Sequence, residues 1–161
     1  MDRLWSPWRY RYVSKVSPLD ACVFCAKAAE DRDEENLILY RGEYNYVLLN
    51  MYPYTTGHLM VVPYAHIANL EELPDATAQE LMRLTQTAVR HLRNVYRPQG
   101  LNAGLNLGEC AGAGVAGHLH MHVLPRWAGD ANFMTTVGET RVMPEDLGAT
   151  WQRLRNAFQS P

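Results

Sequence analysis

His118-Leu119-His120-Met121-His122-Val123-Leu124 is the stretch of this chain that says most about its structure, and it holds three of the six histidines. Histidine alternates with apolar residues throughout. Because successive side chains of a β-strand point to opposite faces, the histidines would share one face at steps of roughly 6.6 Å, and the apolar residues would face a core. Three histidines that only pack would each need a buried hydrogen-bond partner. The pattern therefore predicts a strand whose histidines act together.

A glycine-rich segment, residues 100–117, directly precedes the histidines. Alternating histidines can bind a metal, since imidazole is a common ligand of transition metals. In a covalent site, one neutral imidazole attacks phosphorus while the others hold oxygens and donate protons. The glycines favour the covalent site, because they let backbone N–H groups approach an anion closely, and Asn106 adds an amide donor. The segment is not a P-loop, because no Gly-Lys-Ser/Thr follows it.

The remaining secondary structure predicts an antiparallel α+β fold. Strands are expected over residues 36–41, 46–50 and 59–62, with a turn at Gly42. They do not alternate regularly with helices, as the strands of a parallel sheet would.

Two helices follow from apolar spacing. The first opens at the capping box Thr77-Ala78-Gln79-Glu80 and ends at Pro98 and Gly100. Its buried stripe is predicted to be Leu81, Leu84, Ala88, Leu92 and Val95. The second begins at Pro144, a favoured first helical position. Its stripe is predicted to be Leu147, Trp151, Leu154 and Phe158.

Length and composition indicate a single globular domain. We expect it over residues 21–161 of the 161, with an arm rich in aromatic residues and arginine over residues 1–20. The arm would pack on the body or a partner subunit, or close over substrate. The net charge of −2 argues against nucleic-acid partners, which need a basic face. No uncharged apolar run approaches the ~20 residues of a membrane span, and no signal peptide is evident, so no membrane partner is expected and the cytoplasm is the expected location.

The motif Cys22-Val23-Phe24-Cys25 has three interpretations: a redox pair, two zinc ligands, or two reduced cysteines without metal. A thioredoxin-like redox motif is expected in a βαβ unit, which the predicted strands do not form. The spacing alone does not choose between zinc and no metal.

The chain resembles the histidine-triad (HIT) family. Residues 118–124 match its His-φ-His-φ-His-φ-φ signature, where φ is apolar, and Asn50 with residues 57–63 resembles the family's upstream block. The similarity runs from about Cys22 to Phe133. The first residues, Trp5-Ser6-Pro7-Trp8-Arg9, and residues 126–133 are more similar to the bacterial branch of diadenosine tetraphosphate phosphorylases. The resemblance implies a five-stranded antiparallel sheet with one long helix and a C-terminal helix, in a homodimer.

The resemblance also implies an activity. It is the cleavage of diadenosine tetraphosphate or a related dinucleoside polyphosphate through a covalent nucleotidyl-His120 intermediate, with inorganic phosphate or water as the second reactant. Alternatives are a nucleoside phosphoramidate hydrolase, as in the smaller branch of the family, and a nucleotide-binding regulatory module with incidental turnover. No organic cofactor is implied.

Roles carried over from the family fall into two groups. His120 and His122 are the implied catalytic residues. The implied substrate contacts are Asn50, Asn106, Gly112, Ala113, Gly114, Phe24, His118 and Trp127. For Phe24, a plain core position is an equal alternative to contact with adenine. Relatives carry glutamine or serine in the phosphate loop, where this chain has Ala113-Gly114-Val115, so backbone amides would have to serve.

Zinc-bearing relatives pair two cysteines with two histidines. The matching residues are Cys22, Cys25, His66 and His118, a closed set suited to structural zinc. Such an ion would stabilise the fold without taking part in chemistry. His58 would then be a packing or hydrogen-bonding residue behind the site.

Overall fold

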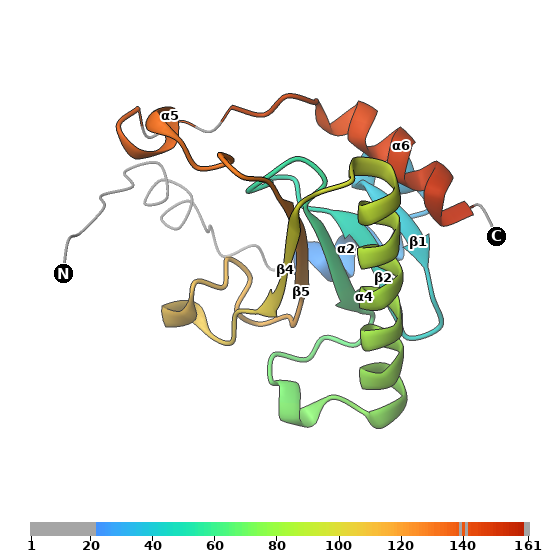
Figure 1. Cartoon of the computed structure of the whole chain (residues 1–161). Helices are drawn as coiled ribbons and strands as arrows, with labels where there is room; N and C mark the ends of the chain where they lie inside the picture. The colour runs from blue at the N-terminus through green and yellow to red at the C-terminus, as the bar shows by residue number, and fades with distance from the viewer. Residues whose placement is uncertain (1–21, 139, 141, 160–161) are drawn as a thin grey trace.

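The computed structural model describes residues 22–138, 140 and 142–159. The predicted arm over residues 1–20 lies outside them. A five-stranded sheet forms the centre of the molecule (Figure 1), in the order β1-β2-β3-β5-β4 with every neighbouring pair antiparallel. The strands are β1 (Ile38–Arg41), β2 (Asn45–Leu49), β3 (Leu59–Pro63), β4 (Gly100–Leu105) and β5 (Met121–Arg126). The predicted α+β class and five-stranded antiparallel sheet are confirmed.

Helices cover both faces of this sheet. The helices of the described residues are α2 (Val23–Ala29), α3 (Asp33–Asn36), α4 (Asp75–Tyr96), α5 (Phe133–Thr136), which stands apart from the sheet (Figure 1), and α6 (Leu147–Gln159), with short 3-10 turns η1 (Leu70–Glu72) and η2 (Glu109–Ala111). The long helix α4 and the C-terminal helix α6 lie on the same side (Figure 1). Across the described part of the chain, no helix combines the length and apolar character that crossing a membrane requires.

The core has two layers, because the side chains of β2 and β3 alternate between the faces of the sheet. Val47 and Leu49 join the larger cluster under α4 and α6. Tyr46 and Leu48 face the other way and join a smaller cluster with Phe24 of α2. Both predicted helical stripes lie in the larger cluster, where Ala88, Leu92 and Leu154 are fully buried. The α2 side is the face that carries the histidines.

The predicted capping box of the long helix is wrong. The helix begins at Asp75 after Pro74, so residues 77–80 lie inside its first turns. Glu80 is buried and accepts hydrogen bonds from three consecutive backbone N–H groups: Glu43 (3.0 Å), Tyr44 (2.7 Å) and Asn45 (2.8 Å). The carboxylate thus satisfies donors of the β1–β2 turn rather than those of its own helix, because tertiary packing brings that turn against α4.

Two further boundaries differ from prediction. The last helix begins at Leu147, not Pro144, and Asp146 accepts a hydrogen bond from the N–H of Ala149 (2.9 Å) as an N-cap does. The glycine-rich segment is not all loop either. Its first part is the edge strand β4, which pairs with β5 along its whole length. Glycine has a weak strand preference, so only pairing with β5 produces this strand.

Candidate functional site

The three histidines share one face, as predicted, although the strand begins later than expected. Strand β5 begins at Met121, so His118 and His120 lie just before it. The N–H of Leu119 donates to the carbonyl of Ile67 (2.7 Å), which ties this segment to the loop after β3. The ring of Phe24 lies 5.4 Å from that of His118 and 5.0 Å from that of His120. The rings of His120 and His122 are 4.8 Å apart.

His120 is held in one tautomer by the backbone. Its Nδ1 lies 2.8 Å from the carbonyl oxygen of His118. Because a carbonyl only accepts, Nδ1 carries the proton and Nε2 keeps a free lone pair. Burial lowers the pKa of His120, which keeps the ring neutral at physiological pH. A neutral imidazole with an exposed lone pair on Nε2 is what nucleophilic attack on phosphorus requires.

A chain of two hydrogen bonds through His58, here called the relay, sets the tautomer of His122. The N–H of Tyr54 donates to Nδ1 of His58 (3.1 Å), so His58 holds its proton on Nε2. That proton is donated to Nδ1 of His122, 2.9 Å away. His122 therefore carries its own proton on Nε2, a buried atom with no hydrogen-bond partner among the described residues. This N–H is a donor available to a substrate oxygen.

Both rings of this relay stay neutral. Burial and the neighbouring histidines lower the pKa of His58 to about 3 and that of His122 to about 4. His58 is only 1% exposed. The sequence-based view of it as a hydrogen-bonding residue behind the site agrees with this geometry. The N–H of Tyr54 could not be foreseen, because a backbone donor leaves no signal in the sequence.

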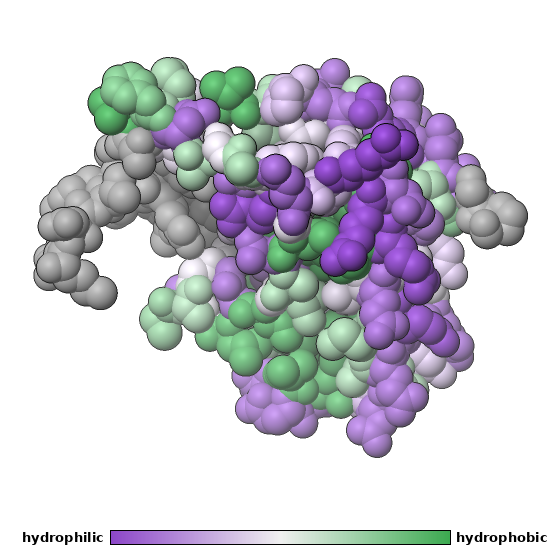
Figure 2. Space-filling view, in the orientation of Figure 1, coloured by the Kyte–Doolittle hydropathy of each residue, from purple (hydrophilic) through white to green (hydrophobic). Residues whose placement is uncertain are grey.

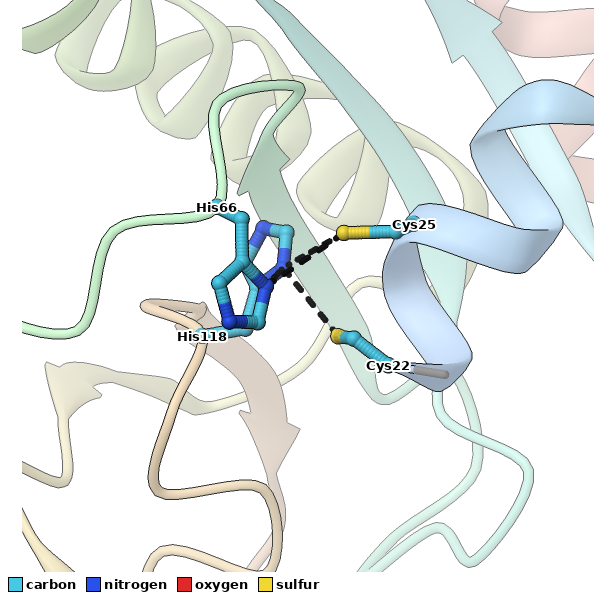
Figure 3. Close-up of side chains that lie close together, drawn as sticks. All are labelled: Cys22, Cys25, His66 and His118. Atoms are coloured by element: carbon cyan, nitrogen blue, oxygen red, sulfur yellow. Dashed lines mark hydrogen bonds between the residues drawn. The ribbon is translucent and has the colours of Figure 1, made fainter. Parts of the chain in front are cut away.

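The two cysteines and two histidines matched to zinc ligands come together (Figure 3). Cys22 and Cys25 lie at the start of α2, His66 in the loop after β3, and His118 just before β5. Their ligand atoms all lie within 4.8 Å of one another. Both cysteines are free thiols rather than a disulfide.

The distances in this cluster fit a tetrahedral ion. His118 Nδ1 lies 3.3 Å from Cys22 Sγ, 3.5 Å from Cys25 Sγ and 3.2 Å from His66 Nδ1. Zinc with bonds of about 2.0 Å to nitrogen and about 2.3 Å to sulfur would separate such atoms by about 3.3 to 3.8 Å. His118 Nε2–H donates to the carbonyl of Pro63 (2.9 Å), which leaves the lone pair of Nδ1 directed at the cluster. The donor set therefore suits zinc, with a backbone carbonyl orienting one ligand.

Asn106 lies level with the histidines. It directly follows Leu105, which pairs with Met121 across the β4–β5 ladder, so it stands opposite the segment that carries His120. Its Nδ2 donates to the carbonyl of Gly112 (3.5 Å), across the loop that begins here. Asn106 thus bridges the mouth of the glycine-rich loop beside the triad.

The amides of that loop divide into two groups. The N–H of Gly112 donates to the Glu109 carbonyl (2.9 Å) and that of Ala113 to the Gly108 carbonyl (3.3 Å), so both close the turn. Gly108 and Gly112 have φ of 85° and 94°, a region in which other residues are strained. The next three N–H groups donate no hydrogen bond within the described residues: Gly114, Val115 and Ala116. An anion held by this loop would thus find its free donors slightly later than the predicted Gly112–Gly114.

The other predicted substrate contacts fall in different places. Asn50 follows β2, with its Nδ2 3.4 Å from Nδ1 of His58, on the relay that leads to His122. Phe24 is only 5% exposed and belongs to the core, which favours the packing alternative. Both ring nitrogens of His118 are engaged, which favours the metal role over substrate contact.

Trp127 is not brought to the triad. Its ring contacts Tyr96 at the end of α4, with centroids 6.4 Å apart. It lies beyond the far end of β5, separated from His120 by about 23 Å of extended chain. The structure therefore places it away from His120 of the same chain.

Comparison with known proteins agrees with this site. The model of the HIT domain family matches residues 31–129. The AP-4-A phosphorylase of Mycobacterium tuberculosis (strain CDC 1551 / Oshkosh) is 46% identical over 157 residues, which cover 93% of this chain and 80% of that protein. A bis(5'-adenosyl)-triphosphatase of Saccharomyces cerevisiae (strain YJM789) is 31% identical over 91 residues, 56% of this chain and 44% of that protein.

A solved structure is similar over most of the chain. It is a Zn-bound histidine triad family protein from Mycobacterium smegmatis, with a TM-score of 0.68 and 29% identity over 86% of this chain and 94% of that one. The matched domain spans both the upstream asparagine block and the whole triad. The neutral histidines, the glycine-rich loop and these matches lead to one conclusion: the chain belongs to the HIT domain family.

Proposed function

We propose that this protein is an enzyme that cleaves diadenosine tetraphosphate or a related dinucleoside polyphosphate through a nucleotidyl-His120 intermediate. The observation that carries the proposal is the hydrogen bond from His120 Nδ1 to the carbonyl of His118 (2.8 Å), which leaves Nε2 free to attack. The relative named AP-4-A phosphorylase supports the substrate class.

In the first step, the Nε2 lone pair of His120 attacks the adenylyl phosphorus. A P–N bond forms, the P–O bond to the rest of the polyphosphate breaks, and ATP leaves from diadenosine tetraphosphate. The Nε2–H of His122 donates to a phosphoryl oxygen as charge develops there. No proton has to leave His120 before attack, because its neutral tautomer is already set.

In the second step, phosphate or water attacks the same phosphorus and the P–N bond breaks. Phosphate gives ADP, and water gives AMP. His120 returns to its neutral tautomer, with Nδ1–H still donating to the His118 carbonyl. The stronger likeness to a protein named phosphorylase favours phosphate.

Substrate is held by neutral groups in this proposal. Asn50 binds ribose hydroxyls, while Asn106 and the free amides of residues 114–116 hold phosphate oxygens. Backbone N–H groups of a glycine-rich loop can bind an anion without a lysine. This suits a chain with only two lysines, Lys15 and Lys27.

We also propose a zinc ion bound by Cys22, Cys25, His66 and His118, supported by the close approach of their ligand atoms, four pairs of which lie 3.2 to 3.5 Å apart, and by the Zn-bound relative. Four protein ligands leave no open position for substrate, so the ion supplies structural stability rather than Lewis-acid chemistry. Reduced cysteines beside imidazoles fit the cytoplasm, which we propose as the location.

A homodimer is the proposed assembly. Strand β4 is an edge strand with exposed residues, and unpaired strand edges invite pairing. Figure 2 shows hydrophobic residues gathered between this edge and α4, whose outer face is hydrophilic.

Product analysis tests the reaction. Protein is incubated with diadenosine tetraphosphate, with and without inorganic phosphate. ADP plus ATP only with phosphate identifies a phosphorylase, whereas AMP plus ATP without phosphate identifies a hydrolase. A far higher rate on a nucleoside phosphoramidate would replace the proposal with the phosphoramidate hydrolase. Tight nucleotide binding with negligible turnover on every substrate would indicate a regulatory module instead.

A further inference from the structure

His118 belongs to two sites at once. Its side chain directs Nδ1 at the cluster of Cys22, Cys25 and His66 (Figure 3). Its backbone carbonyl accepts the Nδ1 proton of His120. One residue therefore connects the metal ligands to the nucleophile, with a single peptide unit between them.

The backbone of this connection has little support of its own. Strand β5 begins only at Met121, so the His118 carbonyl lies outside the sheet ladder. Two backbone hydrogen bonds hold the segment: His118 N–H to Val115 at 3.4 Å, which is long, and Leu119 N–H to Ile67 at 2.7 Å. The imidazole of His118 is also held by the Pro63 carbonyl, by the ring of Phe24 and by the cluster.

A bound ion would hold the His118 ring more firmly than hydrogen bonds within the cluster can. In the cluster, two imidazole nitrogens lie 3.2 Å apart beside two sulfur atoms. Without an ion, only the hydrogens of the thiols and imidazoles could link these four groups, through hydrogen bonds most of which involve sulfur and are weak. With an ion, four bonds of defined length and angle fix the ring. Fixing the ring would also restrict the position of the His118 carbonyl, because ring and carbonyl belong to one buried residue.

We propose that metal bound by this cluster positions the nucleophile: by fixing His118, it holds the carbonyl that keeps the proton of His120 on Nδ1 and its lone pair on Nε2. This inference rests on the proposed role of His120. It goes beyond the expectation that zinc only stabilises the fold. His118 is then a positioning residue for the first chemical step, and the activity becomes sensitive to zinc supply.

The proposal predicts a split between turnover and binding. Within the described residues neither Asn50 nor Asn106 makes a hydrogen bond to His118, so substrate affinity should change less than turnover when metal is lost. The rate of His120 nucleotidylation should fall on the order of tenfold to a hundredfold, as small misplacements of reacting groups do.

The test compares zinc-loaded protein with His66→Ala, which removes the exposed ligand and disturbs the core least. His91→Ala, at a histidine on α4 outside both the cluster and the glycine-rich loop, is the matched control. Nitrogen-15 NMR of the imidazoles, without substrate, reports the tautomer of His120. Loaded protein and the control should show one Nδ1–H form, and His66→Ala a mixture or an exchange-broadened signal.

A His120 signal that stays a single Nδ1–H form in folded, metal-free protein would overturn the proposal, as would an unchanged labelling rate there. If His66→Ala does not fold, wild-type protein is stripped by a chelator at a temperature where circular dichroism shows it still folded, and is then reloaded. If chelation also unfolds it, cadmium, a larger diamagnetic ion with longer bonds to nitrogen and sulfur, replaces zinc, and a His120 signal insensitive to the change of ion would refute positioning. Turnover that survives in His120→Ala would instead refute the proposed function, without affecting the NMR result.

Discussion

Replacing His58 should slow the first chemical step far more than it destabilises the fold. In His58→Phe, the Nε2–H that donates to His122 Nδ1 (2.9 Å) is lost. His122 is then free to hold its proton on Nδ1 and to turn a lone pair, rather than a donor, toward the phosphate. Loss of one such donor costs about 10²–10³ in kcat. The unpaired buried nitrogen costs about 1–3 kcal/mol of stability.

These magnitudes separate the loss of catalytic rate from the loss of stability. A domain with a free energy of unfolding of about 5–15 kcal/mol stays almost wholly folded after such a loss, so unfolding cannot explain a hundredfold slower step. The assay is quenched-flow labelling of the protein with adenine-labelled diadenosine tetraphosphate, with urea denaturation run in parallel.

His58→Gln is the matched control. Its side-chain amide can place an N–H near the position of the lost Nε2–H and should restore much of the labelling rate. Labelling of His58→Phe at the wild-type rate, or equal defects in the two variants, would refute the assignment of the His122 tautomer.

Four further predictions follow from the site and the fold. His120→Ala should abolish covalent label in base-quenched samples and lower kcat on the order of 10⁴-fold or more; label on another residue would revive the metal interpretation of the triad. Folding lowers the pKa of His58 to about 3 and that of His122 to about 4, so at mildly acid pH the unfolded chain binds two protons that the folded chain does not. This stability is present at neutral pH and is lost as the pH falls below about 6.5, with a slope that approaches about 2.7 kcal/mol per pH unit before His122 itself titrates near pH 4; urea midpoints at descending pH measure the loss. Elemental analysis should find close to one zinc per chain, and Cys22→Ala should lose it and lower the melting temperature; well under one zinc in protein made with zinc present would contradict the site. Glu80→Gln should cost about 1.5–3 kcal/mol in urea denaturation, since it weakens charge-assisted hydrogen bonds to the β1–β2 turn, and an unchanged midpoint would show that those bonds contribute little.

The sequence alone determined the features that depend on local spacing. Alternation of histidine and apolar residues placed the triad on one face, and spacings of three and four identified the buried stripe of α4. Apolar runs located β2 and β3 to within a residue at each end. These patterns can be recognised without the tertiary structure, because each depends only on neighbours within a turn or a strand. The family signature, which is itself a local pattern, supplied the five-stranded sheet and the metal ligands.

Only the tertiary structure decided what depends on residues far apart. The cluster joins Cys22 to His118 across 96 positions, and the relay joins His58 to His122 across 64. β4 is a strand because β5 pairs with it, and Glu80 binds a distant turn instead of its own helix end. The tautomers of the histidines follow from backbone groups, which are the same in every residue and so leave no mark in the sequence. The sequence therefore indicated that His120 is the candidate nucleophile, whereas only the fold showed that its proton lies on Nδ1.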